Sequence, residues 1–146
     1  MSTDVVAVIL RAFKAVQTRD AQLESGAFAA DVDLHWPPEL PYGGSTRSRN
    51  PDSPTWSNTW DPLQPTEAER DLEPRVVAAS DDEVVVLWRQ KGVTPSGERI
   101  DTPVLGLYEV KGGKVRRGQM FYFNPSDVVR FLAAAGSDYR GSSRVV

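Results

Sequence analysis

The chain has 146 residues, a formal net charge of -3 and an apolar share of 40%. This length suits one domain with one core, and the small negative charge gives no electrostatic case for binding nucleic acid or an anionic membrane surface. The absence of cysteine and the presence of one histidine, His35, exclude disulfides, thiolate catalysis and metal sites built on cysteine or several histidines. We therefore expect no metal and no cofactor, and neither a nucleic-acid nor a membrane partner.

The first third of the chain predicts two helices and a strand. Apolar residues recur at helical spacing over residues 3–18. Asp20 can cap a second, shorter helix that reaches Phe28, and residues 31–36 alternate polar and apolar as a strand does. The first apolar run has no basic flank before it and no small-residue cleavage site after it, so it does not resemble a signal peptide. We expect a cytoplasmic protein.

The middle of the chain is rich in proline. Residues 37–65 contain seven prolines and a Gly43-Gly44 pair, which predicts a long irregular segment with one short helix around residues 56–60. A capping box beginning at Thr66 predicts a helical turn. Strands are expected at about residues 74–80 and 83–91.

The last third predicts a β-hairpin and a helix. Residues 97–110 and 115–124 are rich in strand-forming types, and Gly112-Gly113 lies in the turn between them. A helix is expected from Asn124 to Gly136, followed by a polar tail over residues 137–146. The predicted class is α+β, a single domain over residues 1–136 with an antiparallel sheet packed on helices.

Three stretches resemble the nuclear-transport-factor-2-like superfamily, specifically its SnoaL-like polyketide cyclase branch. They are residues 18–32, residues 41–47 and residues 96–115. The resemblance implies a cone-shaped fold, in which a curved antiparallel sheet wraps the N-terminal helices around an internal apolar pocket. It also implies cyclisation or isomerisation of a small cyclic or polyketide-like molecule by proton transfer, although members without chemistry share the fold.

The catalytic carboxylates of characterised relatives are absent from this chain. The positions that match the ketosteroid isomerase residues carry Phe13, Trp36 and Gly106. The Arg and Asp of the epoxide hydrolases fall at Leu87 and Arg89, and the last-strand aspartate falls at Met120 or Phe121. The resemblance therefore leaves two functions open, a SnoaL-like enzyme and a non-catalytic small-molecule-binding protein.

Three side chains remain as candidates for catalysis. His35 is the only histidine in the chain, and histidine is the side chain most often used as a general acid or base, although His35 alternates with Trp36 and would then face away from the pocket. Arg89 and Tyr108 could stabilise developing negative charge. The alignment places Leu87 and Arg89 on the cavity face, whereas hydrophobicity alone would bury Val84, Val86 and Trp88.

Eight further residues are expected to contact a ligand. An aromatic-rich loop over a cone can act as a lid, which is the role considered for Trp56 and Trp60. The expected ligand contacts are Phe13, Trp36, Trp56, Trp60, Leu87, Thr102, Met120 and Tyr122.

The match to the family predicts a homodimer through the convex face of the sheet, with Trp88, Leu105 and Leu107 exposed there.

Overall fold

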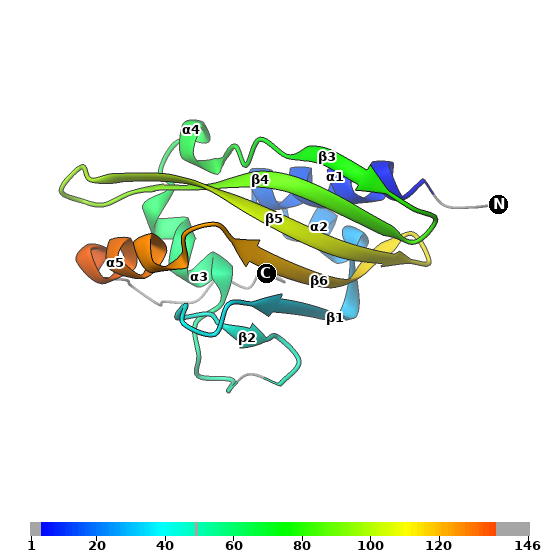
Figure 1. Ribbon diagram of the computed structural model, residues 1–146, viewed down its shortest axis with the longest axis horizontal. Helices are drawn as coiled ribbons and strands as arrows, with labels where there is room; N and C mark the ends of the chain where they lie inside the picture. Colours follow the sequence, from blue (N-terminus) through cyan, green and yellow to red (C-terminus); the bar gives the residue numbers. More distant parts are fainter. Residues whose placement is uncertain (1–3, 49, 137–146) are drawn as a thin grey trace.

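A six-stranded, open sheet forms the body of the protein, with its strands in the order β2-β1-β6-β5-β4-β3 (Figure 1). The computed structural model describes residues 4–48 and 50–136, so the predicted tail at residues 137–146 lies outside the described residues. The strands are β1 (Phe28–Trp36), β2 (Gly44–Ser45), β3 (Arg75–Ala79), β4 (Glu83–Val93), β5 (Arg99–Lys111) and β6 (Lys114–Tyr122). The α+β class and the curved sheet are as predicted.

The helices pack against one face of this sheet or close its end. In Figure 1, α1 and α2 lie behind the strands, and α3 and α5 lie at the end opposite the chain start. The helices are α1 (Val5–Thr18), α2 (Ala21–Ala27), α3 (Trp56–Trp60), α4 (Glu67–Arg70) and α5 (Pro125–Ala135), with a 3₁₀ turn η1 (Asp61–Leu63) after α3.

Helix α1 is the element that fills the concave side of the sheet. The Asp4 carboxylate accepts hydrogen bonds from the backbone N–H groups of Val6 and Ala7, at 3.1 and 3.2 Å, and so caps the first turn. Arg19 ends the helix in the left-handed conformation, at φ 55°. The buried face of the helix carries Val8, Ile9, Ala12 and Phe13, among others.

The hairpin of β5 and β6 follows from its two-glycine turn. Lys111 pairs with Lys114, so Gly112 and Gly113 alone form the loop. Both glycines have positive φ, 61° and 74°, which the tight turns preferred in hairpins demand. The long β4–β5–β6 meander then builds most of the concave wall.

Two details of the first strand differ from the prediction. Helix α2 ends at Ala27 and β1 begins at Phe28, so Phe28 is strand rather than helix and the strand starts three residues before the predicted Asp31. Strand β1 pairs with β6 in parallel, while the other pairings are antiparallel. The sequence pattern does not reveal that pairing, because the paired residues, such as His35 and Gln119, lie more than eighty positions apart along the chain.

Candidate functional site: an apolar cavity between helix α1 and the sheet

A cavity lies between α1 and the concave face of the sheet. The space open to the centre of a water molecule is about 50 Å³, which is room for roughly three to five waters. Every lining side chain is aliphatic or aromatic. The lining residues are Ile9, Ala12, Phe13, Val16, Phe28, Leu34, Trp36, Trp56, Leu72, Trp88, Tyr108 and Met120.

Aromatic rings form much of the cavity wall. Phe13 contacts Trp88 and Tyr108 edge to face, with ring centroids 6.0 and 5.8 Å apart. Trp36 and Trp56 lie nearly parallel, at 6.3 Å and 12°. Rings in these arrangements give the cavity flat aromatic sides.

A buried hydrogen-bond network fixes one wall from behind. The Gln90 side-chain oxygen accepts from the Trp56 indole N–H at 2.7 Å and from the Tyr122 hydroxyl at 3.0 Å. Because Tyr122 donates to Gln90, it must accept from the Tyr42 hydroxyl 2.7 Å away. Tyr42 in turn accepts from the Trp60 indole N–H at 3.0 Å. This network holds the Trp56 ring in the cavity wall.

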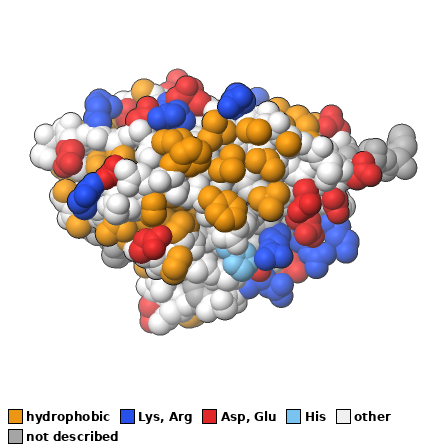
Figure 2. All heavy atoms as spheres, in the orientation of Figure 1, with side chains coloured by type: hydrophobic (Ala, Val, Ile, Leu, Met, Phe, Trp, Pro, Cys, Tyr) orange, Lys and Arg blue, Asp and Glu red, His pale blue; other side chains and the backbone are white. Residues whose placement is uncertain are grey.

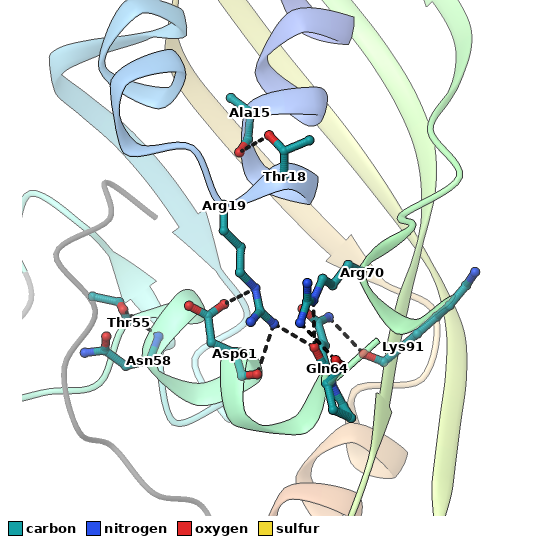
Figure 3. Close-up of polar contacts among 10 residues, drawn as sticks. Ala15, Thr18, Arg19, Thr55, Asn58, Asp61, Gln64, Arg70 and Lys91 are labelled. Atoms are coloured by element: carbon teal, nitrogen blue, oxygen red, sulfur yellow. Dashed lines mark hydrogen bonds and ion pairs between the residues drawn. The ribbon is translucent and has the colours of Figure 1, made fainter. Parts of the chain in front are cut away.

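The segment that carries Trp56 is also anchored at its far end (Figure 3). The Arg19 guanidinium donates to the backbone carbonyls of Asp61 and Gln64, at 3.0 and 2.9 Å. The Gln64 amide donates to the Lys91 carbonyl at 3.0 Å, and Arg70 Nε donates to the Gln64 carbonyl at 2.9 Å. The turn after α3 is thereby tied to the end of α1 and to β4.

The tyrosines inside the domain stay protonated at neutral pH. Burial raises the pKa of each of Tyr108, Tyr42 and Tyr122 above the ordinary value for tyrosine, because a phenolate inside the domain would lose its hydration. A buried tyrosine of this kind can donate a hydrogen bond but cannot act as a general base near neutral pH. Among the described residues that line the cavity, there is no other hydroxyl and no carboxylate, imidazole or cationic group.

Five of the predicted site residues line this cavity. They are Phe13, Trp36, Trp56, Tyr108 and Met120. Three others are buried elsewhere. Trp60 stacks on Phe131 of α5 at 5.8 Å, Tyr122 belongs to the network behind the wall, and Thr102 lies opposite Gln90 on β5. Trp56 and Trp60 are both buried and hydrogen-bonded, so the segment that bears them is closed in this structure. Its role as a lid stays a prediction.

Strand β4 turns one face toward the cavity, and it is the face opposite to the one expected from the match to the family positions. Its burial alternates so that Val84, Val86 and Trp88 point inward. Leu87 and Arg89 lie on the outer face, where Arg89 pairs with Asp101. A shift of one residue in a strand alignment exchanges the faces, so the expectations that Arg89 and Leu87 face the cavity and that Trp88 lies on the convex surface are wrong. The alternation of apolar residues along this strand was the signal that correctly placed Trp88 on the buried face.

His35 also lies outside the cavity. It is on the outer side of β1, where its Nε2 is 2.9 Å from a carboxylate oxygen of Asp33 and where Ser45 donates to the other oxygen. Partial burial raises the pKa of Asp33, but the hydrogen bonds from Ser45 and His35 more than offset this effect, so the net pKa is lowered. The alternation with Trp36 correctly indicated the face of His35. The structure therefore does not bring His35, Arg89 and Tyr108 together.

Membrane and metal features can be judged for the described part of the chain. No helix in residues 4–48 or 50–136 is long and apolar enough to cross a membrane. Within the same ranges, no three histidine, aspartate or glutamate side chains gather closely enough to hold a metal ion.

The fold and the cavity together define a class of small α+β proteins in which a curved sheet wraps a helix around an apolar pocket. The chain belongs to the SnoaL-like domain family, whose family model matches residues 9–118. No curated protein among those compared matches the chain significantly.

Solved structures with the same fold resemble the chain over most of its length. A protein of Jannaschia sp. CCS1 that is assigned as a SnoaL-like polyketide cyclase is 19% identical, with a TM-score of 0.60, and the match covers 90% of this chain and 94% of that one. IdmH of Streptomyces antibioticus, assigned as a polyketide cyclase, is 17% identical, with a TM-score of 0.60 and coverage of 88% and 99%. TerC, co-crystallised with polyporic acid, is 14% identical, with a TM-score of 0.60 and coverage of 88% and 99%. At these identities the likeness establishes the fold alone.

Proposed function

We propose that the chain binds a small, flat, largely apolar molecule in the cavity between α1 and the sheet. The observation that carries this proposal is the lining itself, in which the described side chains are aliphatic or aromatic and only the Tyr108 hydroxyl is ionisable. Pockets that bury most of an apolar ligand have this composition. TerC, which shares the fold, was crystallised with a small molecule, and this supports the use of the cone as a ligand site.

Binding can be tested with tryptophan fluorescence, because Trp36, Trp56 and Trp88 line the cavity. Titration with single-ring aromatic compounds should give a saturable change in emission with a stoichiometry of one. Ala12→Leu should weaken or abolish the change by filling the cavity from the α1 side, whereas Ala135→Leu near the end of α5 should leave it intact. Absence of saturable binding by any such compound would refute a ligand site here.

A second candidate is catalysis of cyclisation or isomerisation at the same site. The family and the Tyr108 hydroxyl in the cavity wall favour it, because a protonated tyrosine can stabilise an oxygen that gains negative charge. With Arg89 and His35 outside the cavity, proton transfer would need a base on the substrate or in solvent. Tyr108→Phe should then lower turnover by about 10²–10³ with little change in affinity, whereas a pure binding protein would show no turnover to lose.

The outer face of the sheet supports a homodimer. Figure 2 shows hydrophobic side chains gathered over β4, β5 and β6. The register places Val85 beside Leu107, and Leu105 between Leu87 and Phe121. Leu107 and Phe121 are 38% and 51% exposed, and a contiguous apolar patch on a folded domain usually marks an interface.

The dimer can be tested by sedimentation or light scattering at micromolar concentration. Phe121→Glu should convert a dimer into a monomer. Leu23→Glu, which changes another exposed apolar residue, on α2, should leave the dimer intact. A wild-type protein that sediments as a monomer would refute this part of the proposal.

A further inference from the structure

Leu72 occupies an unusual place in the wall of the cavity. Of the described residues that line the cavity, only Leu72 lies outside a helix or a strand. It belongs to residues 71–74, which connect α4 to β3 without regular secondary structure (Figure 1), and its side chain is 3% exposed. Leu72 is therefore the lining side chain that can move without unfolding a helix or a strand.

The backbone of this connection is strained next to Leu72. Glu73 has a φ of 48°, in the left-handed region that few residues other than glycine adopt. Pro74 follows it, and a residue before proline ordinarily prefers extended backbone. Strain of this kind is found at ligand clamps and switch regions, where it forms part of the mechanism. A rotation at Glu73 toward ordinary φ would release the strain and move Leu72.

Three polar contacts hold the connection closed. The Leu72 backbone N–H donates to Oε1 of Gln17 on α1 at 2.8 Å, and the Arg89 backbone N–H donates to the Leu72 carbonyl at 2.8 Å. Glu73 forms an ion pair with Lys91 of β4. Both sequence neighbours of Leu72 are exposed, so water can satisfy the backbone groups that are freed when the connection opens.

The cavity comes closest to solvent at the same place. Among the described lining residues, only Val16 is partly exposed, and the others are buried. Val16 directly precedes Gln17, whose side chain holds Leu72. The way from solvent into the cavity therefore passes between the end of α1 and Leu72.

The size of the cavity requires some part of the wall to move. The open space is about 50 Å³, whereas an apolar cavity of roughly 150 Å³ holds one benzene molecule. A single ring thus needs more room than the wall leaves with Leu72 in place. Trp56 is held by its hydrogen bond to Gln90 at 2.7 Å, and the rest of the lining lies on helices and strands. Leu72 is the part of the wall that yields.

We propose that Leu72 is a plug that fills part of the ligand site, and that a ligand displaces it by moving residues 71–74. This inference rests on the proposed use of the cavity as a ligand site, and it adds the route of entry and the residue that limits ligand size. The entrance lies between the end of α1 and the edge of β4, and not beneath α3.

The first test weakens the closed state without enlarging the cavity. Gln17→Met leaves the Leu72 N–H without an acceptor only while the connection is closed. The dissociation constant of fluorobenzene, measured by ¹⁹F NMR titration, should therefore fall by about 2–10-fold, the change that corresponds to one hydrogen bond. Gln22→Met, which changes an exposed glutamine on α2, should keep the dissociation constant of the wild type.

The second test follows the plug itself by hydrogen exchange in the wild type. With saturating fluorobenzene, the amides of Leu72 and Arg89 should exchange about 10-fold faster or more, because both hydrogen bonds of the Leu72 backbone are broken when the plug is displaced. A ligand inside a fixed wall would leave these two amides unchanged or slow their exchange.

Two results would overturn the plug while leaving the cavity as a ligand site. One is fluorobenzene binding with unchanged or slower exchange at Leu72 and Arg89, and the other is a dissociation constant for Gln17→Met that does not fall. Faster exchange at the Trp56 indole N–H in place of these amides would move the entrance to the α3 segment and would also overturn the proposal. Absence of fluorobenzene binding by both the wild type and Gln17→Met would refute the ligand site, and with it the plug.

Discussion

Replacing Gln90 by methionine tests the network behind the cavity wall. The change removes the oxygen that accepts from Trp56 and from Tyr122. The Trp56 indole N–H then loses its acceptor, and one hydroxyl proton of the Tyr42–Tyr122 pair loses its acceptor too. Each buried donor left unpaired costs about 1–3 kcal/mol. The Gln90 amide nitrogen is itself buried and has no hydrogen-bond partner among the described residues. The substitution removes it as well, which offsets about one such penalty.

The balance is a loss of about 2 kcal/mol in the free energy of unfolding. In a domain of this size such a loss lowers the melting temperature by about 4–8 °C. Urea denaturation at neutral pH measures it as a lower midpoint with an unchanged slope. A double-mutant cycle with Trp56→Phe isolates the hydrogen bond, because the cost of Gln90→Met should be smaller by about 1 kcal/mol when the indole N–H is already absent. Identical costs in both backgrounds would refute the assigned role of Gln90.

Three other predictions follow from the same structure. Burial raises the pKa of Tyr42, Tyr108 and Tyr122 in the folded protein. As pH rises above about 10, the unfolded chain loses these three protons before the folded protein does. The free energy of unfolding should therefore fall, by up to about 4 kcal/mol per pH unit. Tyr108→Phe should reduce that slope by about a third in urea midpoints measured against pH, and an unchanged slope would contradict the assignment. Arg19→Met should destabilise the domain by about 1–2 kcal/mol through its lost bonds to two carbonyls, whereas exposed Arg11→Met should stay within about 0.5 kcal/mol; equal effects would show that Arg19 is not an anchor. Gly106→Ala should cost about 1–3 kcal/mol in thermal unfolding, because its Cβ would overlap the Tyr108 ring. Gly26→Ala, with nothing within 4 Å of its Cβ, should be neutral or stabilising. The reverse order of the two effects would refute the packing of Tyr108.

Local patterns in the sequence predict most of the elements. Helix α1 follows from the spacing of its apolar residues, and the β5–β6 hairpin follows from Gly112 and Gly113, because each signal lies within the element it predicts. The capping box at Thr66 is likewise present in the structure. The parallel pairing of β1 with β6 has no local signal and could not be predicted.

The site was less predictable than the fold, and β4 explains why. Its apolar alternation buries Val84, Val86 and Trp88, while an alignment by eye that is wrong by one residue turns the whole strand over. The partnership of Trp56 with Gln90 joins residues 34 apart in sequence, and only the folded chain brings them together. Tyr108 could be chosen from its residue type and strand position, but its nearness to Trp88 depends on the space above Gly106.

The two edges of the sheet bear on how copies of the chain can meet. One edge is β2, which has two residues, and the other is β3, which has five residues and a register shift against β4. A very short edge strand and an irregular one are poor templates for adding a further strand. Edge-to-edge growth of the sheet into fibrils is therefore disfavoured, although the sheet is not closed. Association through the outer face would instead stop at two subunits, because a two-fold contact uses up the same patch on both.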